Sequence, residues 1–254
     1  MIFVWRSECY GLYLQTNNHL FFFIMTIAEL EQSQAEIIEE IYSFAERVGL
    51  SNDNVEPIPD GVYSVEKYLS APTQVMWILK EPHDDFDENG EPYGGGWNLF
   101  AAYDNDDAWS QRTWQPIIYA MYGLFNNQKW VDMDEIRNNK SMADVLKQIA
   151  NINVSKMPAL KATNDSSLWK KYDMWKVILT KQIAIYTPKI IIFGNTFRYF
   201  KNDLIGADIK PIKSIDGIVD IYEKADVRFL DTYHPNQKMV KRCDYVNSII
   251  KACL

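Results

Sequence analysis

Runs of apolar residues alternate with amphipathic segments along most of the chain, and this alternation predicts the fold. Residues 75–79 (Val-Met-Trp-Ile-Leu) and 190–193 (Ile-Ile-Ile-Phe) are apolar at every position. Such runs are typical of strands that are buried on both faces of a parallel sheet. Shorter segments at 152–154 (Ile-Asn-Val) and 227–230 (Val-Arg-Phe-Leu), each with one polar residue, predict two further strands.

The segments between these runs show the periodicity of helices that bury one face. The predicted helices cover residues 27–48, 114–125, 141–149, 168–186 and 195–200, and a last one ends near Ala252. Thr26 and Glu29 have the spacing of a capping box at the start of the first helix, and Asp216-Gly217 predicts a hairpin turn. We therefore expect an α/β fold with a central, mainly parallel sheet, helices on both faces and an N-terminal helical extension.

The length of 254 residues is that of one α/β domain, which we place at residues 25–254. The apolar run from Leu20 to Met25 is too short to cross a bilayer. Only Arg6 is basic before it, so a signal peptide is weakly supported. We expect residues 1–24 to be a non-native or disordered extension ahead of a natural start at Met25. We also expect a cytoplasmic protein without a membrane partner.

The net charge and the cysteine content disfavour some classes of function, namely proteins with a broad DNA-binding surface and proteins with cysteine-ligated metal sites. The net charge of -8 counts against a broad basic surface for duplex DNA, although a local basic patch is enough for some nucleic-acid binders. Cys9, Cys243 and Cys253 form no CxxC pair. We therefore expect neither an iron–sulfur cluster nor a zinc site, and no other cofactor.

Polar residues or glycine lie at the end of each of the four predicted strands, where α/β sheets form their sites, and Asn153 lies within the second of these strands. In chain order they are Lys80, Glu81 and His83, then Asn153 and Lys156, then Gly194 and Asn195, then His234 and Asn236. Each has an ordinary explanation alone: Glu81 as a solvated loop acid, His234 as a packed histidine, Gly194 as a tight turn. Their order at successive strand ends predicts one shared site.

From about Gln74 onward, the chain resembles the uracil-DNA glycosylase superfamily. The matching segments are residues 75–83, Asn153-Val154-Ser155-Lys156-Met157-Pro158, Pro188 through Gly194, and Tyr233-His234-Pro235-Asn236. Three positions depart from the family pattern. Leu79 replaces a glycine, Glu81 replaces Asp, Asn or Ala, and Asn236 replaces a serine.

The resemblance implies a DNA-repair hydrolase that cleaves the N-glycosidic bond of a modified base, such as uracil, in DNA. In that reading Glu81 positions water and stabilises positive charge on the sugar. His234 stabilises negative charge on the leaving base, and Asn153 reads the base edge. The other residues expected to contact the base are His83, Tyr93, Trp97 and Phe100, with Gly94-Gly95-Gly96 allowing close approach.

A member of this family that acts on duplex DNA must flip the base out of the stack. The residues expected to contact DNA, single-stranded or duplex, are Lys156, Lys238, Met239, Lys241 and Arg242. Met239 is the expected wedge. The alternative for the segment after His234 is the solvated basic face of a helix. Acidic residues between 84 and 91 and between 104 and 107 oppose phosphate binding.

Two other functions fit the same residues. One is a non-catalytic descendant of the fold that binds a nucleobase, a nucleotide or a protein. Glu81, Asn236 and the acidic loop favour it, because a carboxylate displaced by about 1 Å can lower a rate by about 10²-fold. The other is a hydrolase or transferase that acts on a small nucleoside, which needs no DNA surface.

Overall fold

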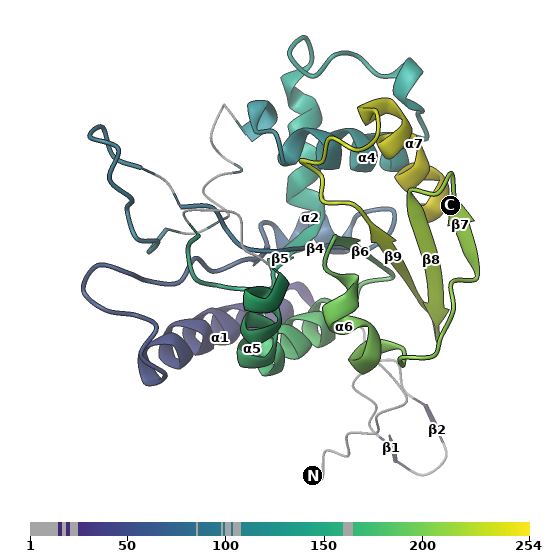
Figure 1. Cartoon of the computed structure of the whole chain (residues 1–254). Helices are drawn as coiled ribbons and strands as arrows, with labels where there is room; N and C mark the ends of the chain where they lie inside the picture. Colours follow the sequence, from purple (N-terminus) through teal and green to yellow (C-terminus); the bar gives the residue numbers. More distant parts are fainter. Residues whose placement is uncertain are drawn as a thin grey trace.

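The computed structural model describes residues 15–16, 19–20, 25–84, 86–97, 99, 103, 108–159 and 165–254. Its main feature is a seven-stranded sheet in the order β3-β5-β4-β6-β9-β8-β7 (Figure 1). The strands are β3 (Gly61–Val62), β4 (Val75–Leu79), β5 (Ala150–Asn153), β6 (Ile190–Gly194), β7 (Lys213–Ile215), β8 (Val219–Lys224) and β9 (Val227–Thr232). The four central strands are parallel, whereas β3, β8 and β7 pair antiparallel at the two edges.

Helices cover both faces of the sheet, as the sequence predicted. They are α1 (Ile27–Arg47), α2 (Val65–Leu69), α4 (Trp114–Asn126), α5 (Asp165–Tyr186), α6 (Phe197–Leu204) and α7 (Arg242–Cys253). Helices α1, α5 and α6 lie on one side of the sheet, and α4 and α7 lie on the other (Figure 1). Short 3-10 helices are η1 (Ala108–Ser110), η2 (Trp130–Asp132) and η3 (Lys140–Gln148). Segment η3 replaces the α-helix predicted at 141–149.

Strand β4 shows why its sequence is apolar throughout. Met76 and Ile78 belong to the core under α1 and α5, whereas Val75, Trp77 and Leu79 belong to the core under α4 and α7. All five side chains are buried. A strand in the middle of a two-sided sheet has no solvent-facing position, so its sequence does not alternate.

The first helix begins with the predicted capping box. The Thr26 hydroxyl accepts the backbone N–H of Glu29 at 3.3 Å, and the Glu29 carboxylate accepts the backbone N–H of Thr26 at 2.8 Å. Leu30, Ile37 and Ile41 on this helix are buried in the main core. Helix α1 is therefore an integral part of the domain rather than an appended extension.

Two short strands precede this helix. The strands β1 (Gln15–Thr16) and β2 (His19–Leu20) pair antiparallel with each other, apart from the main sheet. The rest of the expected extension at residues 1–24 lies outside the described residues. Within the described part of the chain, no helix is long and apolar enough to cross a membrane.

The predicted hairpin connects β7 and β8. Asp216 and Gly217 at its turn have φ values of 53° and 67°. Successive left-handed residues are typical of hairpin turns, so the predicted hairpin is confirmed. Because Ile215 pairs with Val219, its loop holds three residues.

The connections of the central strands diverge between β4 and β6. From β4 the chain passes to β5 on one side, and from β6 it passes through α6 to β7, β8 and β9 on the other. In open α/β sheets, ligands bind beyond the carboxyl ends of the strands at such a switch point. The four polar motifs of the sequence follow β4, β5, β6 and β9, so they all lie at this edge of the sheet.

Candidate functional site

Gly194 allows the first and last motifs to come together. It ends β6, which lies between β4 and β9. A Cβ atom at this position would lie 2.7 Å from Cδ2 of Leu79 and 3.1 Å from Cδ of Pro235. The side chain of Leu79, at the end of β4, and that of Pro235, beyond β9, thus both lie over the end of β6, where glycine leaves them room.

Hydrogen bonds fix the segments that leave the strand ends. The backbone N–H of Asn195, whose φ is 62°, donates to the carbonyl of Thr232 at 2.8 Å. On the other side of the switch point, the N–H of Ser155 donates to the carbonyl of Lys80 at 3.0 Å. Backbone pairing therefore continues past the strands and holds all four motifs in register.

His234 is held as a neutral imidazole with a defined tautomer. Its Nδ1 accepts the backbone N–H of Asn236 at 3.2 Å. Burial, and secondly the positive charge of Lys80, lower the pKa of His234 from 6.5 to about 4. At neutral pH the ring therefore carries its proton on Nε2, which is a hydrogen-bond donor without a positive charge.

Glu81 is an ion-paired carboxylate rather than a solvated loop acid. Its side chain is only 5% exposed, and it contacts the ammonium of Lys171 on α5, which is 29% exposed. A carboxylate this buried requires such a partner, because removing a charge from water is costly. The sequence analysis did not single out Lys171, which occupies an ordinary position on an amphipathic helix.

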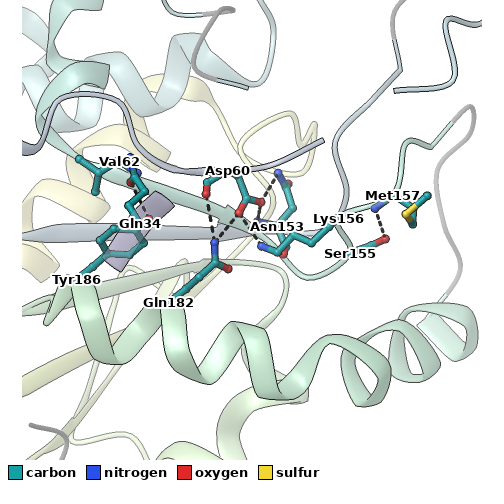
Figure 2. Close-up of polar contacts among 9 residues, drawn as sticks. All are labelled: Gln34, Asp60, Val62, Asn153, Ser155, Lys156, Met157, Gln182 and Tyr186. Carbon is teal, nitrogen blue, oxygen red and sulfur yellow. Dashed lines mark hydrogen bonds and ion pairs between the residues drawn. The ribbon is translucent and has the colours of Figure 1, made fainter. Parts of the chain in front are cut away.

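Asn153 belongs to a buried polar network, which Figure 2 shows. The Asp60 carboxylate accepts the backbone N–H of Asn153 at 2.7 Å and its Nδ2 at 3.3 Å. The same carboxylate accepts Nζ of Lys156 at 2.6 Å and Nε2 of Gln182 at 2.9 Å. The amide of Asn153 is thereby oriented, with its NH₂ group toward Asp60.

Lys156 is part of this network and is fully buried. Its ammonium also donates to the backbone carbonyl of Asn153 at 2.8 Å. Burial lowers the pKa of Lys156, and the neighbouring Asp60 opposes that shift. The predicted phosphate contact is incompatible with this position, because the ammonium does not reach the surface. The sequence analysis missed Asp60, which lies in the turn-forming sequence Pro59-Asp60-Gly61.

The three consecutive glycines after the acidic loop have φ values of 80°, 85° and 74°. The N–H groups of Gly94 and Gly95 donate to the carboxylate of Asp84 at 2.8 and 3.1 Å. A Cβ atom on Gly94 would lie 1.9 Å from the carbonyl oxygen of Asn54. Gly94 and Gly95 therefore pack against the preceding loop and hold the carboxylate of Asp84, which is buried and not part of an acidic rim.

Three of the four ring-bearing residues expected around the base, His83, Tyr93 and Trp97, lie in the described part of the chain. Tyr93 and His83 are exposed, and Nδ1 of His83 lies 2.7 Å from the carbonyl oxygen of Asp84. The indole N–H of Trp97 is buried without a hydrogen-bond partner in the described part of the chain. Phe100 lies outside the described residues.

The segment after His234 presents an exposed methionine on an ordered loop. Met239 is 79% exposed. The side chain of Gln237 accepts the N–H of Val240 at 2.9 Å and donates to its carbonyl at 3.1 Å. The predicted DNA contacts Lys238, Lys241 and Arg242 are also exposed. Because α7 begins only at Arg242, the two lysines lie on the loop before the helix.

In the described ranges, no group of three or more His, Cys, Asp or Glu side chains is arranged to hold a metal ion. Comparison of the sequence with models of known protein families and with curated proteins found no match. Function is therefore inferred from the residues at the strand ends.

Proposed function

We propose that this protein is a glycosylase-like hydrolase that cleaves the N-glycosidic bond of a modified base in DNA. The observation that carries the proposal is His234. Its imidazole is held neutral at the carboxyl end of β9, and its Nδ1 is occupied by the backbone N–H of Asn236. The proposal also rests on the resemblance of the four strand-end motifs to the uracil-DNA glycosylase superfamily.

Such a reaction needs a donor for the negative charge that develops on the departing base. When the bond from the sugar C1′ to the base breaks, its electron pair stays with the base. The Nε2–H of His234 donates a hydrogen bond to that charge. A fixed donor in a water-poor site needs no reorganisation during the reaction, and losing one such donor typically costs about 10²- to 10³-fold in rate.

Glu81 supplies the complementary charge. Its ionised carboxylate stabilises the positive charge that develops on the sugar, and it positions the water that adds to C1′. The proton of this water passes to the carboxylate as the new C–O bond forms. The ion pair with Lys171 holds the carboxylate of Glu81 in place before the substrate binds.

Asn153 is suited to select the base. Because its NH₂ group faces Asp60, its carbonyl oxygen is the atom left to accept a hydrogen bond from a base. Uracil, hypoxanthine and xanthine each present a ring N–H that can donate to such an acceptor. These three bases are therefore the proposed substrates.

A base-release assay tests the proposal. Single-stranded and duplex oligonucleotides that carry uracil, hypoxanthine or xanthine are incubated with the wild-type protein and with Glu81→Gln. We expect release of at least one base, and a loss of about 10²-fold or more in the variant. Release at the same rate in both proteins would refute the role of Glu81.

One observation favours a second candidate function. The carboxylate of Glu81 is already engaged by Lys171, so little of it faces solvent. The same residues then form a binding site for a nucleobase or nucleotide without catalysis. Saturable binding of a modified-base oligonucleotide, with no base release over hours, would favour this function.

A further inference from the structure

The amine of Lys171 is the more exposed member of its ion pair. The side chain of Lys171 is 29% exposed, whereas that of Glu81 is 5% exposed. Helix α5 begins at the edge of the sheet that carries the strand-end motifs, and Lys171 lies in its second turn. A sugar bound against Glu81 therefore also meets the amine of Lys171.

The other ion pairs of α5 involve more exposed carboxylates. Lys176 pairs with Asp203 and Lys181 pairs with Glu40, and both acidic partners are far more exposed than Glu81. Those pairs lie on the outer surface, where an ion pair contributes little. The pair of Lys171 and Glu81 joins a helix to the end of a central strand, at the proposed catalytic carboxylate.

We propose that Lys171 is a second reactive group, which forms an imine with the aldehyde of an abasic deoxyribose and leads to strand cleavage there. The inference rests on the proposed function, since the sugar that remains after base release is the substrate of this second step. Lysine amines form Schiff bases with carbonyl substrates when a neighbouring group activates them. Glu81 is placed to be that group.

The steps balance without an additional reagent. Lys171 gives one proton to Glu81, and its free amine attacks C1′ of the open-chain sugar. The nitrogen passes one of its protons to the former carbonyl oxygen, Glu81 returns the other proton to the same oxygen, and this oxygen leaves as water when the protonated C=N bond forms. A base, again Glu81, then removes a proton from C2′. The bond from C3′ to the phosphate oxygen breaks, and the phosphate leaves with the electron pair. Water finally hydrolyses the imine and regenerates the amine.

Reductive trapping tests the inference directly. The full-length protein is incubated with an oligonucleotide that carries a preformed abasic site, in the presence of sodium cyanoborohydride. Hydride from this reagent converts an imine into a stable secondary amine. We expect a covalent protein–DNA adduct, which peptide mapping by mass spectrometry places on Lys171. We also expect cleavage at the abasic site when the reductant is omitted.

Two variants provide matched controls. Lys171→Arg keeps a cation beside Glu81 but has no nucleophilic amine, so adduct formation should fall at least tenfold while the thermal midpoint is retained. Lys170→Arg changes the neighbouring, exposed lysine and should leave the adduct yield unchanged. An adduct that maps to another amine, an equal yield in Lys171→Arg, or no adduct at all overturns the inference.

The abasic substrate separates this inference from the proposed function. Base release without an adduct would leave the glycosylase in place and remove the role of Lys171. An adduct on Lys171 without release of any modified base would support the imine chemistry and count against the glycosylase.

Discussion

At the scale of single residues, the lowered pKa of His234 makes the stability of the folded protein depend on pH. His234 has a pKa of about 4 in the folded protein, below its unfolded value of 6.5. Between these two values the unfolded chain binds more protons, so the free energy of unfolding decreases as the pH falls from 6.5 to 4. The stabilising contribution of neutral His234 is therefore fully present only above pH 6.5.

The pKa shift of Asp231 changes stability with pH in the opposite direction to that of His234. Burial, and then the charge of Asp220 opposite it, raise the pKa of Asp231 from 3.8 to about 6, while Arg198 and Lys201 oppose the shift. The folded protein binds the additional proton here, so stability decreases as the pH rises from 3.8 to 6. The two effects partly cancel in wild-type protein, and a His234 variant is needed to separate them.

We predict that His234→Gln changes stability differently at two pH values. Urea unfolding at pH 7 and pH 4.5 should show that the variant loses less stability on acidification than wild type does. The difference should be about 2 to 3 kcal/mol, because the proton uptake of His234 on unfolding is removed. Equal losses in the two proteins would show that His234 is not held neutral.

At the scale of elements, Asp60 connects the segment before β3 to β5 and α5. Its carboxylate is the only counter-charge shown for the buried ammonium of Lys156 among the described residues. We predict that Asp60→Asn destabilises the protein by about 3 to 5 kcal/mol, because it leaves a buried charge uncompensated.

A double-mutant cycle in urea measures this coupling. Lys156→Met removes the charge while keeping an unbranched side chain. The double variant Asp60→Asn/Lys156→Met should therefore be more stable than Asp60→Asn alone. Additive losses from the two single changes would indicate that the pair does not interact.

Elements with a strong apolar pattern were predictable, and elements defined by distant partners were not. The strands β4 and β6 and the helix α5 were expected close to their observed positions. Strand β3 has only two residues and is defined by its pairing with β5, so its local sequence carries no strand signal.

Site residues that are defined by distant partners were likewise not predictable from the sequence. Glu81, His234 and Asn153 were predictable because each follows or ends a strand. Lys171 contacts a residue 90 positions away, and Asp60 contacts Lys156 at a separation of 96 positions. Only the folded arrangement brings these charges together, and it also shows that Lys156 serves the core rather than DNA.

At the scale of the whole molecule, the net charge of -8 limits the strength of the proposed DNA binding. The exposed cations after His234 are few, so we expect a shallow salt dependence. Three phosphate contacts to a duplex correspond to a slope of about -3 in a plot of log affinity against log salt concentration. Lys238→Ala/Lys241→Ala should reduce the magnitude of that slope by about 2. Fluorescence anisotropy with a labelled duplex measures it, and an unchanged slope would place the DNA surface elsewhere.

The proposed joint action of Glu81 and His234 in catalysis is tested most directly by base release under single-turnover conditions. Wild type, Glu81→Gln, His234→Ala and the double variant are compared on the best substrate at pH 7.5. We predict losses of about 10²-fold or more in each single variant, and a double variant no slower than about tenfold below the worse one, because the two groups act in one step. Base release by the double variant at the wild-type rate would show that the strand-end site does not catalyse the reaction.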